Sequence, residues 1–135
     1  MNNGTAPKAI DIHAALASRP MLRNRGPETT GPEKEGAFAR LAETGNGAVF
    51  AGSFQGQSDW ERHRFGDELV QILAGETQLT ILTDEGRSVL DMKAGMLVVV
   101  PQGSWHKFDS PNGVTVLTMT PQPTDHTTAE DPAAT

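Results

Sequence analysis

Two short stretches of the chain carry side chains that could bind a metal ion. Glu61, His63 and Glu68 precede an apolar run that ends at Gly75, and His106 follows a second apolar run. Carboxylate oxygens and neutral imidazole nitrogens are ordinary ligands of divalent transition metals. If the four side chains meet, the sequence predicts a site with two histidines and two glutamates.

Strand geometry would bring the first three of these side chains together. Side chains alternate across a strand, so Glu61 and His63 would point to the same face of an extended segment over residues 59–64. Residues 65–67, Phe-Gly-Asp, allow the chain to turn. Glu68 would then open a second strand on the side of His63. The predicted metal ligands are therefore Glu61, His63, Glu68 and His106.

Each of these residues also has an explanation that needs no metal. A single histidine in a strand is more often a surface residue or a hydrogen-bonded structural one. Glu68 could be an exposed carboxylate at a strand start, and Glu61 could pair with Arg62 or Arg64. The site would then be weak or empty, and two neighbouring carboxylates would bind a proton or an arginine instead.

Composition places the chain among small all-β proteins that do not bind nucleic acid. A length of 135 residues fits a single domain. The 14 glycines and nine prolines suit a fold with many turns better than a helical bundle. The net charge of −6 argues against a nucleic-acid partner, which would require a basic face.

Other features of the sequence give expectations about the compartment. The chain has no cysteine, so neither a disulfide nor a thiolate metal ligand is possible. No apolar run approaches the roughly 20 residues of a membrane span. Residues 1–7 lack the charged and apolar regions of a signal peptide. We therefore expect a cytoplasmic protein with no membrane partner.

Many short, evenly spaced strand patterns predict a β-sandwich or barrel. Asn46-Gly47 favours a tight hairpin because both residues tolerate positive φ. A short helix is expected from Asp11, which can cap it, to Ser18. The expected strands cover residues 37–43, 48–54, 59–64, 67–74, 77–83, 87–92, 96–100, 104–109 and 114–120. They predict a barrel over residues 37–120, between an N-terminal extension over 1–36 and a flexible C-terminal tail over 121–135.

The two ligand-bearing stretches resemble the two motifs of the cupin superfamily. The first family motif runs G-x5-H-x-H-x3,4-E-x6-G. Residues 61–75 match it from the first histidine position onward, except that Glu61 stands in place of that histidine. The second motif runs G-x5-P-x-G-x2-H-x3-N. Residues 95–106 match it through His106, whereas Ser110 stands in the position of the final asparagine.

The resemblance implies a double-stranded β-helix, or jelly-roll barrel, with its metal ligands inside. The segment from Trp60 to Glu68 is also similar to the Trp-Glu-x-His…Gly-Asp-Glu first motif of some small single-domain cupins. Small cupins form dimers, and exposed sheet edges need covering in any case, so we expect a homodimer. His126 lies near the end of the chain and is expected to be a tail residue without a role in the site.

The resemblance and the ligand types together favour a mononuclear metalloenzyme that acts on a small polar molecule. A set of two histidines and two glutamates should favour Mn²⁺ or Fe²⁺, with Zn²⁺ or Ni²⁺ also possible. Dioxygenation, isomerisation and decarboxylation are the candidate reactions. The alternative is a barrel that binds a small molecule without turnover, or a degenerate cupin in which Glu61 marks a lost metal site.

Overall fold

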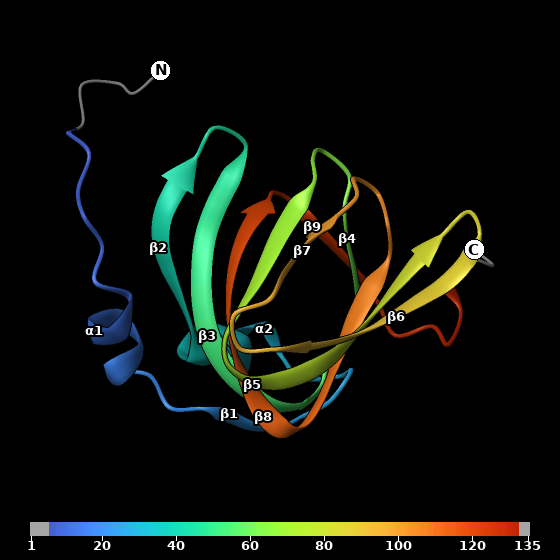
Figure 1. Cartoon of the computed structure of the whole chain (residues 1–135), viewed down its shortest axis with the longest axis horizontal. Coiled ribbons are helices and arrows are strands. Elements are labelled where there is room, and N and C mark those ends of the chain that lie inside the picture. The colour runs from blue at the N-terminus through green and yellow to red at the C-terminus, as the bar shows by residue number, and fades with distance from the viewer. Residues whose placement is uncertain (1–5, 133–135) are drawn as a thin grey trace.

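The fold is a nine-stranded sheet that curls into an open barrel (Figure 1). The computed structural model describes residues 6–132. Two short helices of this part of the chain, α1 (Ile12–Ala17) and α2 (Gly31–Ala37), accompany the sheet. The strands are β1 (Leu22–Arg25), β2 (Phe38–Thr44), β3 (Gly47–Gln57), β4 (Trp60–His63), β5 (Glu68–Thr83), β6 (Gly86–Lys93), β7 (Leu97–Val100), β8 (His106–Pro121) and β9 (Thr124–Thr127). The predicted all-β fold with a short N-terminal helix is confirmed.

Two strands of 16 residues each, β5 and β8, form the centre of the barrel. β5 pairs with β6, β7 and β8, and β8 also pairs with β3 and β4. The sequence predicts two shorter strands in place of each, because Gly75 and Gly113 resemble turn residues. Both glycines have positive φ (73° and 90°) and they lie against each other. The two paired strands therefore bend together at this point without ending.

The hairpin between β2 and β3 is confirmed, but its turn lies one residue earlier than predicted. Thr44 pairs with Gly47, so the turn consists of Gly45 and Asn46. Gly47 instead faces Thr120 and Pro121 of β8, where a Cβ atom would collide with the Thr120 carbonyl oxygen. The glycine is needed for the close approach of two strands and not for the turn.

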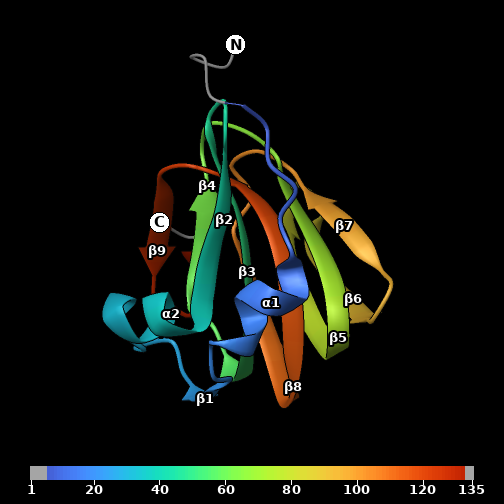
Figure 2. The ribbon, with the colours of Figure 1, turned by 90° about the vertical axis from the view of Figure 1, so that its left-hand side faces the viewer.

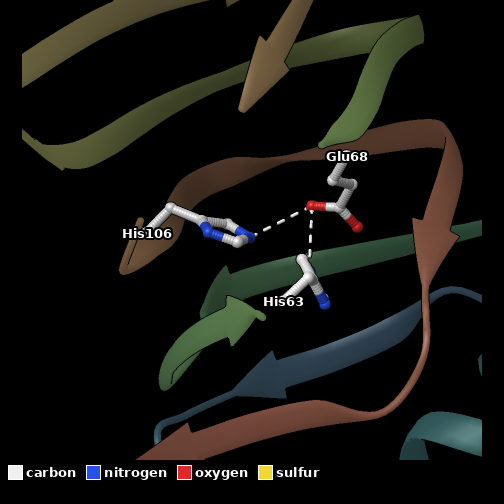
Figure 3. Close-up of side chains that lie close together, drawn as sticks. All are labelled: His63, Glu68 and His106. Atoms are coloured by element: carbon white, nitrogen blue, oxygen red, sulfur yellow. Dashed lines mark ion pairs between the residues drawn. The ribbon is translucent and has the colours of Figure 1, made fainter. Parts of the chain in front are cut away.

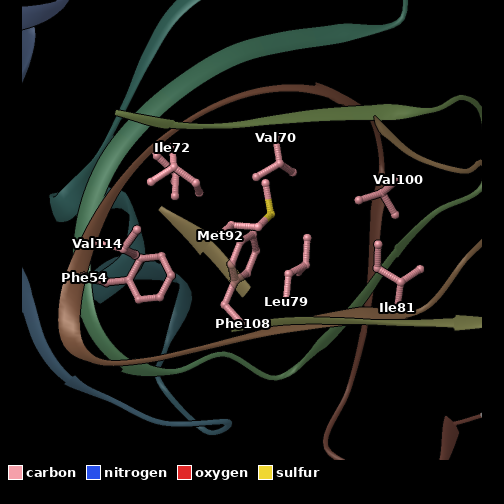
Figure 4. Packing of buried hydrophobic residues seen from close by; sticks show 10 residues of the cluster. Phe54, Val70, Ile72, Leu79, Ile81, Met92, Val100, Phe108 and Val114 are labelled. Carbon is pink, nitrogen blue, oxygen red and sulfur yellow. The ribbon is translucent and has the colours of Figure 1, made fainter. Parts of the chain in front are cut away.

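The hydrophobic core fills the inside of the curled sheet (Figure 4). Val70 and Ile72, which follow Glu68 at every second residue, are both fully buried, as strand alternation predicts. Phe54 and Phe108 meet edge to face, with ring centroids 5.7 Å apart. The other members of the core are Leu79, Ile81, Met92, Val100, Val114 and Val116.

Both segments that flank the predicted barrel add a strand to the sheet. β1 runs parallel to β3, and Figure 2 shows α1 and α2 beside β2 and β3. The tail expected over residues 121–135 contains a strand, because β9 pairs with β4. Residues 133–135 of that expected tail lie outside the described part of the chain. Pro121 and Pro123 hide the pattern of this strand in the sequence, and its hydrogen bonds come from a distant partner. Neither described helix has the length and apolar character needed to cross a membrane.

Candidate metal centre

Three of the four predicted ligands meet inside the barrel (Figure 3). His63 ends β4, Glu68 begins β5 and His106 begins β8. The backbone N–H of Gly103 donates to the carbonyl oxygen of His63 (2.9 Å), which ties the turn of the second motif to the first. The three ligand side chains are buried, with residue exposures of 4%, 5% and 0% in the order given.

The ligand atoms of these residues converge on one point. Glu68 Oε1 lies 3.3 Å from His63 Nε2 and 3.1 Å from His106 Nε2. All three atoms are buried, yet none has a hydrogen bond of acceptable geometry. Because buried polar atoms are nearly always hydrogen-bonded, three such atoms at one point indicate that another group belongs between them. A divalent cation fits this donor set of two imidazoles and a carboxylate.

The outer atoms of all three ligands are held by neighbouring groups. Thr120 donates its hydroxyl to Glu68 Oε2 (2.6 Å). His106 Nδ1 lies 3.0 Å from the carbonyl oxygen of Ser104, which can only accept, so this nitrogen carries the proton and leaves the Nε2 lone pair for a metal. His63 Nδ1 lies 3.0 Å from the Thr124 hydroxyl. Such outer contacts fix the tautomer and ring orientation of metal-binding histidines.

Without a metal, the cluster favours a proton shared between the carboxylate and the imidazoles. Burial alone would raise the pKa of Glu68, but the close approach and charge attraction of the His106 and His63 imidazoles lower the pKa of Glu68 to about 2. Burial alone would lower the pKa of His106, but Glu68 outweighs burial and raises it. A metal must displace such a proton, because it binds neutral imidazole.

Glu61, the fourth predicted ligand, lies outside this convergence. Its Oε2 atom is 3.5 Å from His126 Nδ1, which lies 2.9 Å from Asp59 Oδ2. The ligand atoms of Asp59, Glu61 and His126 lie within 4.8 Å of one another and form a second group. Glu61 and His63 nevertheless line the same cavity, as expected for one strand face. The role of Glu61 as a metal ligand stays a prediction.

Asp59 and His126 lie beside Glu61 although no motif in the sequence points to them. β9 lies antiparallel to β4, with His126 directly opposite Glu61. Its hydrogen bond to Asp59 raises the pKa of His126 above its ordinary value. The segment Thr-Asp-His-Thr is compatible with a strand, but its sequence does not predict that it pairs with β4.

A cavity of about 420 Å³ opens onto the cluster. His63, Glu68, Glu61 and His126 line it together. Its other walls combine apolar and hydroxyl side chains with the charged residues Arg25, Lys34 and Glu35. The apolar and hydroxyl side chains include Phe38, Phe54, Phe108, Val116, Thr118 and Thr120. A hollow of this size that combines aromatic walls with converging polar groups suits a small organic ligand.

Comparison with known proteins identifies the fold through structure alone. No protein-family model matches the sequence. No curated protein matches it either. A solved cupin-2 domain containing protein from Shewanella frigidimarina NCIMB 400 superposes with a TM-score of 0.55 and 21% identity, over 64% of this chain and 80% of that one.

Two enzymes of known structure are similar at lower identity. The match to hydroquinone 1,2-dioxygenase from Sphingomonas sp. TTNP3, solved with 4-hydroxybenzoate bound, has a TM-score of 0.55 and 15% identity, covering 73% of this chain and 68% of that one. The match to the oxalate decarboxylase of Bacillus subtilis, which has Mn(II) centres, has a TM-score of 0.54 and 14% identity, covering 58% of this chain. The match spans only 23% of that decarboxylase chain. The curled sheet, the buried His-Glu-His group and these superpositions together show that the chain has a cupin-like fold.

Proposed function

We propose that the chain is a small metal-binding cupin and a mononuclear metalloenzyme that acts on a small polar molecule. One observation carries the proposal: the ligand atoms of His63, Glu68 and His106 are buried together and lack hydrogen bonds. Leaving buried polar atoms without partners costs about 1–3 kcal/mol each. A bound cation would remove that cost.

The types of the ligand atoms limit which metals the site would bind. Two imidazoles and one carboxylate with open coordination positions are typical of non-haem Fe²⁺ sites, and oxygen-rich sets suit Mn²⁺. Glu61 is the candidate fourth ligand, because it lines the same cavity as His63 and Glu68. The Oε2 atom of Glu61 lies beside His126, so coordination would fall to its other carboxylate oxygen or would need the Oε2 contact to open. Zn²⁺ and Ni²⁺ complete the set of metals to be tested.

The chain supplies binding, orientation and exclusion of water. Ser104, Thr120 and Thr124 hold the outer atoms of the ligands, and the aromatic wall of the cavity keeps part of a ligand away from solvent. A bound metal would act as a Lewis acid toward an oxygen of the substrate. Dioxygenation, isomerisation and decarboxylation are all compatible with this chemistry.

A second candidate is a barrel that binds a small molecule without turnover. The observation in its favour is the pairing of Glu61 with His126, which occupies the carboxylate that stands where cupins have a histidine ligand. Metal content separates the two functions. A protein that folds and binds small molecules but takes up no transition metal would fit the second candidate.

Metal analysis tests the proposal directly. Protein prepared without chelators and reconstituted separately with Mn²⁺, Fe²⁺, Zn²⁺ and Ni²⁺ should hold about one equivalent of one of these metals, by mass spectrometry of the elements. His106→Ala and Glu68→Gln should lose at least 90% of it, since each removes a converging donor. His13→Ala and Glu85→Gln are matched controls, because both side chains are exposed, and they should keep the metal. A folded wild-type protein that binds none of the four metals would refute the proposal.

We also propose that the protein forms a homodimer through the face around β7. Within the described residues β7 pairs only with β5, so its other edge is open. Leu97 and Val99 on β7 are 57% and 48% exposed, and Met119 on β8 is 44% exposed. Val99 and Met119 flank Leu69 in register, so these side chains form one apolar row. An exposed row at an open edge favours association with a second copy.

A further inference from the structure

Arg25 is a largely buried cation without an anionic partner at its guanidinium among the described residues. Its residue exposure is 7%, yet its guanidinium makes no hydrogen bond or ion pair within the described part of the chain. A guanidinium has five N–H donors and remains charged in proteins. No Arg25 nitrogen is among the fully enclosed polar atoms that lack a partner, so its donors reach the cavity, where an anionic ligand would meet them.

The backbone holds Arg25 in this position through two unusual features. Asn24, just before it, has a φ of 55°, and asparagine is one of few non-glycine residues that tolerate this region. Arg25 pairs with Gly56 across β1 and β3, and a Cβ atom at Gly56 would collide with the backbone of Arg25. The chain therefore turns sharply and packs closely to direct this side chain inward.

Two aromatic rings fix the guanidinium. Its central carbon lies 4.5 Å from the ring centroid of Phe54 and 5.7 Å from that of Phe38. Stacking on aromatic rings uses the flat face of a guanidinium in a cation–π interaction. The N–H groups at its edge stay available for hydrogen bonds. A rigid planar fork of this kind is preorganised for two parallel hydrogen bonds to a carboxylate.

The nearby carboxylates, including Glu35 of the same cavity, make no ion pair with Arg25 within the described part of the chain. Burial lowers the pKa of Arg25, and the more distant charges of Glu61 and Asp59 act in the opposite direction. Asp59 is engaged with His126, which also lies beside Glu61. These charges reduce the cost of burying the cation without using its donors.

Arg25 lines the same cavity as His63 and Glu68. A ligand bound by the guanidinium would therefore lie in the same cavity as the metal cluster. The guanidinium stacks on Phe54, the Phe54 ring meets that of Phe108, and the Phe108 ring meets that of His106, so an apolar wall runs from Arg25 toward the metal cluster. This arrangement fits an amphiphilic molecule better than a fully polar one.

We propose that Arg25 is the anion-binding group of the cavity and that the ligand is a small monocarboxylate with an apolar, ring-sized body. The carboxylate accepts two hydrogen bonds from the guanidinium, and the body packs against the phenylalanine rings. The inference deepens the proposed function and rests on it for the chemistry that follows binding. Carboxylate binding itself requires no metal.

Titration calorimetry on chelator-treated protein tests the inference, with benzoate as the carboxylate and benzamide as its neutral isostere. Wild-type protein should bind benzoate at least about tenfold more tightly than benzamide, as charge-assisted bidentate hydrogen bonds predict. Arg25→Met should remove this preference, and Arg25→Lys should recover only part of it because an ammonium lacks the planar fork. Arg23→Met is the matched control, since Arg23 belongs to the same strand but is exposed, and should bind as wild type does.

A measurement on the wild-type protein covers the case in which the Arg25 variants do not fold. The guanidinium Nε–H resonance of Arg25 should shift on addition of benzoate and not of benzamide. Equal binding of the two probes, no benzoate binding, or an unmoved Arg25 resonance would each overturn the inference. Metal content measured separately keeps the two proposals distinguishable, because Arg25→Met should retain its metal.

Discussion

The hydroxyl of Thr120 controls how Glu68 presents its carboxylate to the cluster. It is buried and donates a hydrogen bond of 2.6 Å to Glu68 Oε2, while Oε1 faces the two imidazoles. Thr120→Val removes this donor and nearly preserves the shape of the side chain. A hydrogen bond to a charged group contributes about 1.5–3 kcal/mol. At about 1.4 kcal/mol per factor of ten, the metal dissociation constant should rise about 10- to 100-fold.

The assay is competition between the protein and a chromophoric chelator for the metal that reconstitution identifies. Urea unfolding of the metal-free variant should also show a loss of about 1–3 kcal/mol, because Glu68 Oε2 is left without its donor. Thr115→Val is the matched control: Thr115 lies on the same strand, but its hydroxyl bonds to Ser53, 2.7 Å away. It should leave the metal affinity unchanged. A folded Thr120→Val protein with wild-type metal affinity would refute the view that this contact orients the ligand.

Two further predictions concern pH and association. Because the pKa of Glu68 is lowered on folding, its contribution to stability is present above about pH 4.5 and is lost as the pH falls toward 2. Because the pKa of His106 is raised on folding, its contribution is complete below about pH 6.5 and is lost as the pH rises above that value. Urea midpoints of metal-free protein should therefore be highest between these values, and a steady rise from pH 6.5 to 9 would contradict the assignment. Leu97→Glu should convert the dimer into a monomer by light scattering, while Val89→Glu, also exposed but outside the apolar row, should not. A monomeric wild type would exclude the proposed dimer.

The convergence of His63, Glu68 and His106, the candidate metal ligands, could be predicted because its signals are local. The spacing of Glu61, His63 and Glu68 along two strands fixes which side chains share a face. The turn at Gly103 fixes the position of His106 relative to the preceding strand. The structure brings three of these residues together, and Glu61 shares their cavity although it faces His126.

The remaining parts of the site depend on pairings between distant segments. Arg25 is one of a few arginines near the N-terminus, and only the pairing of β1 with β3 buries it. His126 reaches Asp59 only because β9 pairs with β4. Neither pairing has a short-range pattern, and Pro123 argues locally against a strand. Sequence reasoning therefore found the residues that share a motif and missed those that only the tertiary fold brings close.

The short segment at the end of β8 and through β9 has an evolutionary consequence. Thr120 bonds to Glu68, and Thr124 contacts His63. His126, only a few residues further along the chain, lines the cavity. None of them converges with the His63, Glu68 and His106 donors. Substitutions confined to this segment would change the orientation of Glu68 and His63 and the shape of the cavity. They would leave the candidate metal ligands His63, Glu68 and His106 in place. We therefore expect homologous proteins to differ from one another most in this segment. It is also the segment to randomise in directed evolution of ligand preference.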